Sequence, residues 1–262
     1  MNPKVVAIMA TCGRHQCLER SVKLFLNQDY ENKHLLIYQN SEIPQKLDSK
    51  LKVEFGDKIT LINNHIDKNT NQRFANLGAI YNNAIDHIPN DTDIIIFWDD
   101  DDIFLTNHIS AGVEGLNKVK QLIDKKYIAY KPSRSFYRHA NGIELMGNVL
   151  EPSIFVEADH IKRYGFSNTT TEQHWQWLNP LHHEQTLYQD DNGIPTLLYN
   201  WGDTNIPTFK TSGDFHNPNN FNNYRNFSQD HGDQIITPLS DDEVSKFYLE
   251  IFNWKLINNF KQ

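Results

Sequence analysis

The sequence has few cysteines and no long apolar run. Cys12 and Cys17 are the only two cysteines in 262 residues, which excludes the disulfide framework of a small secreted domain and makes a reducing cytoplasm the expected location. No apolar run approaches the roughly 18 to 20 residues of a membrane span, and the first strand-like run begins at Lys4. We therefore expect a cytoplasmic protein with no transmembrane segment and no signal peptide.

Basic residues are outnumbered by acidic ones. Lys and Arg number 25 against 33 Asp and Glu, and the formal net charge is -8. This balance argues against a protein that holds bare nucleic acid mainly by neutralising phosphates. Alanine is also scarce, with 9 residues against 30 asparagines, a bias that often accompanies AT-rich coding in low-GC bacteria or phages. The 39% of hydrophobic residues is ample for the core of one α/β domain.

The N-terminal half alternates between apolar runs and helical periods. Residues 4–10 form a continuous apolar run, which is typical of a strand buried on both faces. The segments that follow are expected to be a helix at 17–27, strands at 35–38 and 59–62, a helix at 73–88, a strand at 94–98 and a helix from a cap at Thr106 to Ile123. Strand, helix, strand begins a βαβ series, which predicts an α/β fold.

After Lys126 the apolar period changes to two. This predicts strands at 127–131, 135–139, 143–146, 151–156 and 195–199, with a hairpin turn at Asn141-Gly142 and a short helix ending near Gly165. Residues 212–234 are predicted to be a long polar loop, and Ser240 with Glu243 forms a capping box that opens a last helix. We expect a main domain at 1–210, with 211–262 as a mobile loop and a C-terminal helix packed on the same domain.

Four consecutive aspartates are the most informative feature. Asp99 to Asp102 directly follow the apolar run IIIFW, and open α/β sheets bind ligands beyond the carboxyl ends of their strands. Two like charges about 4 Å apart repel by roughly 1 kcal/mol in water and about 4 kcal/mol near a protein surface, so the run favours a bound cation. Oxygen ligands suit Mg²⁺ or Mn²⁺. The alternative is a solvated acidic turn or a helix N-terminus that attracts negative charge.

Several segments, taken in order, resemble the GT-A glycosyltransferases and particularly their family 2. The resemblance runs from about Lys4 to Ile109, and more loosely to Leu178. The matching segments are Thr11 and Arg14 after the first strand, Gln28-Asp29-Tyr30 at a helix end, Asn76-Leu77-Gly78 and Asn82-Asn83 in the next helix, and Asp99-Asp100-Asp101 in place of the Asp-x-Asp motif. The resemblance implies a Rossmann-like mixed central sheet flanked by helices, with a C-terminal extension on the acceptor side.

The resemblance also implies site residues. Asp99 would face the nucleoside sugar, and Asp101 would hold Mn²⁺ or Mg²⁺. The residues assigned in this way to the nucleotide-sugar donor are Thr11, Arg14, Gln39, Asn40, Gly78, Asn82, Asp99 and Asp100, and those assigned to the metal are Asp101, Asp102 and His216. His216 is included because some GT-A enzymes take a further ligand from the C-terminal side. Gln39-Asn40 stands where the family usually has a base-reading aspartate, and an amide also hydrogen-bonds a base edge.

Glu172 is the candidate general base. The family's catalytic acid lies in a Glu-Asp or similar pair that opens a helix, and the segment TTTEQHWQW matches this with Glu172-Gln173. The alternative is a structural glutamate in the first helical turn, capped by Thr169 to Thr171, with Asp190 or Asp191 as the next candidate. Trp175 and Trp177 would line the acceptor or pack in the core.

Two other residue clusters indicate no catalytic site. His182-His183-Glu184 lacks the HxxxH and HExxH spacings of a zinc enzyme. The spacing of Cys12 and Cys17 is not Cys-x-x-Cys, so ordinary thiols are expected rather than a redox pair.

Together these features predict a metal-dependent inverting glycosyltransferase that moves a hexosyl or pentosyl group from a nucleotide-sugar to a hydroxyl acceptor such as a glycan. The leading specific alternative is a phage enzyme that glycosylates hydroxymethylated bases in DNA. Its basic stripe would be Lys118, Lys120, Lys125, Lys126, Lys131, Arg134 and Arg138. A nucleotidyltransferase also uses strand-end carboxylates with Mg²⁺, but no Gly-rich phosphate loop follows the first strand. A non-catalytic sugar-binding module is the last alternative.

Overall fold

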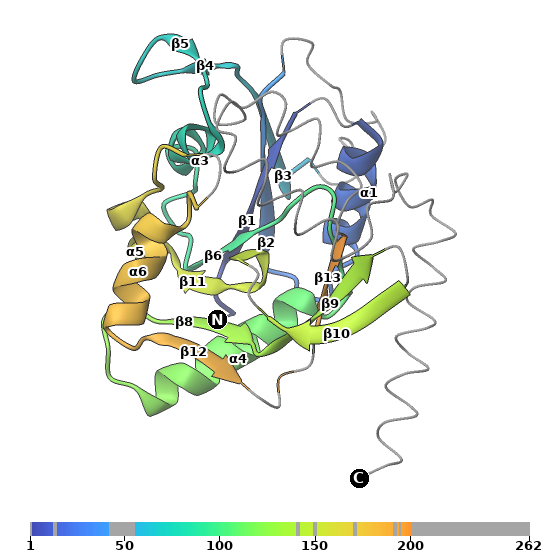
Figure 1. The fold of residues 1–262 in the computed structure, drawn as a ribbon, viewed down its shortest axis with the longest axis vertical. Helices are drawn as coiled ribbons and strands as arrows, with labels where there is room; N and C mark the ends of the chain where they lie inside the picture. The colour runs from blue at the N-terminus through green and yellow to red at the C-terminus, as the bar shows by residue number, and fades with distance from the viewer. Residues whose placement is uncertain are drawn as a thin grey trace.

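The computed structural model describes residues 2–12, 15–41, 56–139, 142–148, 151–169, 172–190, 193 and 195–200. A seven-stranded sheet runs through the centre of this part (Figure 1). Across the sheet its strands are β12 (Leu187–Asp190), β8 (Ala129–Pro132), β11 (Phe155–Glu157), β6 (Ile94–Phe97), β1 (Val5–Thr11), β2 (Lys33–Gln39) and β3 (Ile59–Asn63). Only β11 is antiparallel to its neighbours in this sheet. The other six strands therefore end at one common edge.

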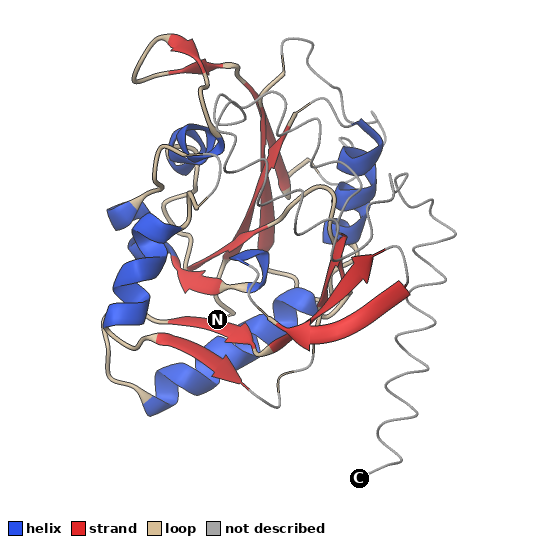
Figure 2. Cartoon of the chain, in the orientation of Figure 1, coloured by secondary structure: helices blue, strands red, loops and turns tan. Residues whose placement is uncertain are grey.

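Helices cover both faces of this sheet (Figures 1 and 2). On one face lie α1 (His15–Leu26) and α4 (His108–Leu122), and on the other lie α3 (Leu77–Ile85), α5 (Ala158–Tyr164) and α6 (Trp175–His183). Ile94 and Ile96 of β6 point into the first core, whereas Ile95 and Phe97 point into the second. Neither face of such a strand meets solvent, so its sequence does not alternate between apolar and polar residues, and this explains the continuous apolar run. The predicted α/β fold with a mixed, helix-flanked sheet is confirmed.

A second sheet has four strands in the order β10 (Gly142–Gly147), β9 (Arg134–His139), β13 (Leu197–Asn200) and β7 (Ile103–Phe104). The antiparallel pairing of β9 with β10 confirms the predicted hairpin, but Gly142 pairs with His139 as the first residue of β10, so the predicted turn position at Asn141-Gly142 is wrong. A small ribbon is formed by β4 (Ile66–Asp67) and β5 (Gln72–Arg73), and a single 3₁₀ turn, η1, spans Glu151–Ser153.

Three predicted elements differ in detail. The helix expected at 73–88 is α3, which begins only after Asn76, because the Asn76 side chain accepts the Ala79 amide at 2.9 Å. The predicted cap at Thr106 is wrong. The N-cap of α4 is Asn107, without a side-chain cap, and the Ile109 amide donates instead to Gln28 Oε1 at 3.1 Å. The strand expected at 151–156 is divided into η1 and β11.

The C-terminal predictions lie outside the described residues. These are the domain boundary at 210, the loop at 212–234 and the helix that begins near Ser240. Within the described residues no helix is long and apolar enough to cross a membrane.

Candidate active site

The four aspartates form a tight turn at the common edge of the sheet. The Trp98 amide donates to Ile8 O at 2.9 Å, which extends the pairing of β6 with β1, and the Asp102 amide then reaches back to Asp99 O at 3.4 Å. Asp100, Asp101 and Asp102 are buried, and Asp99 is partly exposed. The structure therefore puts four carboxyl groups where β1, β2 and β6 end.

Thr11, the last residue of β1, contacts this turn directly. Its hydroxyl donates to Asp100 Oδ2 at 2.5 Å, and both side chains are buried. A hydrogen bond to an ionised acceptor is shorter and stronger than a neutral one. This contact joins two predicted donor-binding residues that are 89 positions apart in the sequence.

Tyr81 approaches the turn from α3. Its hydroxyl lies 3.4 Å from Asp99 Oδ1, and its ring stacks on Phe166 with centroids 4.8 Å apart. Burial, reinforced by Asp99 and Asp100, raises the pKa of Tyr81 well above its usual value. The phenol therefore stays protonated and donates to the carboxylate. Sequence reasoning missed this residue because Tyr81 falls in the apolar stripe of a helix, where only its hydroxyl distinguishes it from a core phenylalanine.

Glu172 lies in the loop before α6, and its side chain is exposed. The prediction that it opens the helix is wrong, because α6 begins at Trp175 and Glu172 has a φ of 62°. His174 anchors this loop to β6, since its buried ring is 4.9 Å from that of Phe97 and 5.7 Å from that of Tyr81. Burial lowers the pKa of His174 to about 3, so the ring is neutral. The packed rings of His174 and Tyr81 thus connect the loop that carries Glu172 to Asp99.

Gln39 and Asn40 occupy the end of the neighbouring strand. Gln39 is the register partner of Thr11 and is buried, and the Asn40 amide donates to Thr11 O at 2.9 Å. The parallel strands therefore place both residues at the same sheet edge as the acidic turn.

Gly78 and Asn82 hold α3 to the segment after α5. A Cβ on Gly78 would lie 1.7 Å from Ser167 O, so only glycine allows this approach. Asn82 exchanges two hydrogen bonds with the backbone of Phe166, at 2.9 and 2.8 Å. Both residues have a structural role here, and their contact with a donor stays a prediction.

The remaining assigned residues divide into three groups. Arg14 and His216 lie outside the described residues. Cys12 and Cys17 form no disulfide. Trp177 is fully buried in the core, whereas Trp175 is 44% exposed, so only Trp175 is available to an acceptor.

The carboxyl groups of the acidic turn are compatible with a hard cation such as Mg²⁺ or Mn²⁺. No group of three His, Cys, Asp or Glu side chains in the described ranges forms a metal cage. Mg²⁺ and Mn²⁺ do not require one, because they take one or two carboxylates and fill the other positions with water and phosphate oxygens. Asp101 and Asp102 offer such carboxylates beside Asp100, one of whose oxygens accepts from Thr11.

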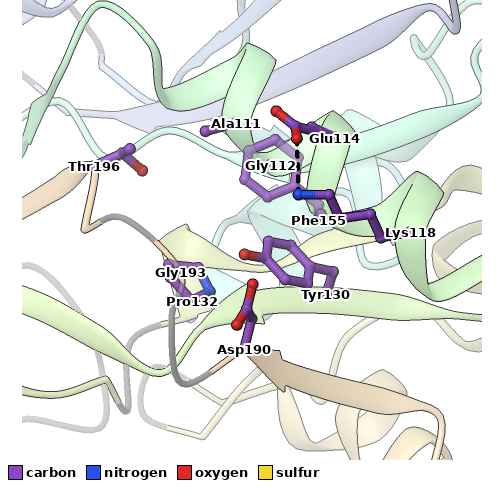
Figure 3. A pocket seen from close by; sticks show the side chains of 11 residues that line it. Ala111, Gly112, Glu114, Lys118, Tyr130, Pro132, Phe155, Asp190, Gly193 and Thr196 are labelled. Atoms are coloured by element: carbon purple, nitrogen blue, oxygen red, sulfur yellow. Dashed lines mark ion pairs between the residues drawn. The ribbon is translucent and has the colours of Figure 1, made fainter.

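A separate cavity of about 170 Å³ lies between α4 and the ends of β8 and β12 (Figure 3). Its walls carry Tyr130, Asp190 and the ion pair of Lys118 with Glu114, whose Nζ and Oε1 are 2.8 Å apart. Burial, together with Asp190 and Glu114, raises the pKa of Tyr130 to about 12. With strands about 4.8 Å apart, β12 lies roughly 14 Å from β6. Asp190 is therefore not adjacent to the acidic turn.

Comparison with known proteins identifies the family and the fold of the chain. The family model described as glycosyl transferase family 2 matches residues 6–182. The structure of S. aureus TarS 1–349 in complex with UDP has a TM-score of 0.57 at 8% identity and covers 76% of this chain and 61% of that chain. The structure of the mannosyltransferase PcManGT from Pyrobaculum calidifontis in complex with GDP-Man and Mn²⁺ has a TM-score of 0.53 at 13% identity. The match covers 76% of this chain and 57% of that chain. No curated protein sequence gives a significant match.

These likenesses concern the fold. The chain spans about three fifths of the two structures, and 36% of a longer S. aureus TarS structure that has a TM-score of 0.56 at 9% identity and covers 75% of this chain. The shared architecture is the GT-A arrangement of a mixed sheet between two layers of helices.

Proposed function

The chain belongs to glycosyl transferase family 2, and from this premise we propose that it moves a sugar from a nucleotide-sugar donor to a hydroxyl acceptor, with inversion and with Mn²⁺ or Mg²⁺ as cofactor. The observation that supports this most is the contact of Thr11 with Asp100 at the edge where β1 and β6 end. Solved GT-A neighbours contain UDP in one case and GDP-Man with Mn²⁺ in another.

The donor would lie along this edge. Asp99, oriented by the Tyr81 hydroxyl, would accept hydrogen bonds from the nucleoside sugar. Asn40, which is partly exposed beside the fully buried Gln39, would contact the base. Arg14 would contact the phosphates. Asp101 and Asp102, with His216, would hold the cation, which when bound offsets the charge that grows on the leaving diphosphate.

Glu172 would accept the proton of the acceptor hydroxyl as it attacks the anomeric carbon. Its exposed carboxylate and its φ of 62° support this role, because a non-glycine residue in this region costs about 1–3 kcal/mol and such residues cluster at active sites. Trp175, whose amide donates to Glu172 O at 3.1 Å, offers an exposed ring for a sugar face. The acceptor would thus enter over the first turn of α6.

A glycan is favoured over modified DNA as the acceptor. In the basic stripe needed for DNA, buried Lys131 donates to Asn148 O at 2.9 Å. The charges of Lys118 and Lys120 are offset by the neighbouring carboxylates of Glu114 and Glu157. Residues 1–210 would form the donor-binding and catalytic domain, with 211–262 as its acceptor-side addition. The cytoplasmic location stays a prediction.

A screen of nucleotide-sugars for Mn²⁺-dependent thermal stabilisation and hydrolysis tests the proposal. A ligand that binds the folded state raises Tm by mass action. If the metal is needed to hold the donor, the correct donor should raise Tm only when the metal is present. The control is Asp101→Ala, which should show no such dependence. Stabilisation without any turnover would favour a sugar-binding module, and the absence of a metal-dependent shift for every donor would contradict the proposal.

A further inference from the structure

Arg20 contacts the backbone of the acidic turn and has no part in the function proposed so far. It is in α1, and its side chain is only 5% exposed. Nη2 donates to Asp101 O at 3.0 Å and to Asp100 O at 3.5 Å. Nε and Nη1 are buried and have no hydrogen-bond partner in the described part of the chain. Burying a charge with so few partners is unfavourable, and the hydrogen bonds to the turn offset part of that cost.

The geometry of this contact indicates what Arg20 does. The Asp100 and Asp101 carbonyl oxygens belong to the two central residues of the turn, and both are held by one nitrogen. Fixing these two peptide groups restricts the backbone from which the carboxylates of Asp100 and Asp101 project. Thr11 holds the same turn through the Asp100 side chain. Arg20 and Thr11 thus restrain the turn at its backbone and at one of its carboxylates.

We propose that Arg20 is a positioning residue, which fixes the backbone of the acidic turn so that its carboxylates are preorganised for a metal-nucleotide complex. The proposal rests on the proposed function only for the identity of that ligand, because the hydrogen bonds to the carbonyl groups exist without it. Preorganised ligands avoid the ordering cost at the moment of binding. Loss of the contact should therefore weaken binding while the fold persists.

Arg20→Lys separates positioning from charge. Lysine keeps the positive charge, but its side chain is one bond shorter and ends in a point charge, so its ammonium stops short of the two carbonyl oxygens. The matched control is Gln28→Asn, which also shortens a buried side chain by one bond. Gln28 donates to Leu105 O at 2.8 Å and accepts from the Ile109 amide. It ties the end of α1 to the chain after the turn and does not contact the aspartates.

Two readouts are needed. The first is hydrogen exchange of the amides at 99–102 in the protein without ligand, where Arg20→Lys should accelerate exchange at least tenfold. The second is Mn²⁺ affinity in the presence of UDP or GDP, measured from the EPR signal of free Mn²⁺, where the same variant should bind at least fivefold more weakly. Gln28→Asn should lower Tm and leave both quantities within twofold of wild type.

The outcomes distinguish the two proposals. If Arg20→Lys leaves exchange at 99–102 and Mn²⁺ affinity unchanged, or if Gln28→Asn changes them equally, Arg20 is only a structural residue and the inference is overturned. If the wild type binds no Mn²⁺ with either nucleotide, the proposed function fails, and the exchange experiment still decides whether Arg20 fixes the turn. Arg20→Met, tested by hydrogen exchange alone, should accelerate exchange of the amides at 99–102 at least as much as Arg20→Lys does. Exchange that is slower in Arg20→Met than in Arg20→Lys would contradict the inference.

Discussion

The hydrogen bond from Thr11 to Asp100 allows a quantitative test of the site. Thr11→Val replaces the hydroxyl by a methyl group of similar size and keeps a β-branched residue in the strand. It removes a donor 2.5 Å from a fully buried carboxylate. Hydrogen bonds to charged groups contribute about 1.5–3 kcal/mol. We expect the free energy of unfolding to fall by this amount, which for a protein of this size lowers Tm by about 3–12 °C.

Thr11→Ser is the matched control, because it keeps the hydroxyl and removes only a methyl group, with an expected loss of about 0.8 kcal/mol. Urea unfolding of the three proteins, followed by intrinsic fluorescence, measures the difference. Thr11→Val should also weaken metal-dependent nucleotide binding more than Thr11→Ser does. If Val is no more destabilising than Ser, the hydroxyl contributes nothing and the assignment of the Thr11–Asp100 contact is incorrect.

Four further results are expected. Asp101→Ala should abolish transfer and metal-dependent nucleotide binding without loss of stability. If the variant keeps more than about a tenth of the wild-type turnover, the activation free energy has risen by less than about 1.4 kcal/mol, and Asp101 is not a metal ligand. Glu172→Gln should lower kcat about a hundredfold or more and leave donor affinity unchanged. If the variant instead loses stability and keeps its kcat, Glu172 is a structural residue. Trp175→Ala should raise the acceptor KM several-fold with little change in kcat, and an unchanged KM would exclude stacking. Because His108 and His174 are buried with pKa values of about 3, the unfolded state takes up protons below pH 6.5, and stability should fall by up to about 1.4 kcal/mol per pH unit for each ring. Urea unfolding at pH 7, 6 and 5 measures this slope. His108→Leu should make the slope smaller by the contribution of one ring, and an unchanged slope would contradict the assignment.

The strands that position the site could be predicted from the sequence because they are buried on both faces. The runs at 5–10 and 94–98 are continuously apolar, and they form most of β1 and β6, which pair side by side. The missed strands lack this signal. β12 reads LYQD with partly exposed side chains, and β7 has only two residues, whose pairing comes from β13 more than 90 positions later. Such strands are defined by their partners and not by their own composition.

Parts of the site follow the same division. Asp99 to Asp102 were predictable because they follow an apolar strand, and parallel strand ends bring Thr11 to them. Tyr81 and Arg20 were not, since a tyrosine in a helical stripe indicates core and an arginine indicates surface. The conformation of Glu172 was also unpredictable, because the packing of His174 and Trp177 against β6 decides where α6 begins.

The described contacts divide the site into two parts with separate functional consequences. The acidic turn is held by Thr11 from β1, by Arg20 from α1 and by Tyr81 from α3, all of which precede it in the sequence. The loop with Glu172 follows the turn and depends on α6. Changes in the first part should therefore alter metal and donor affinity, and changes in the loop should alter the acceptor step. Where the two parts meet, the His174 ring packs on Tyr81 and Phe97, so a substitution of His174 is the one expected to change donor affinity and acceptor turnover together.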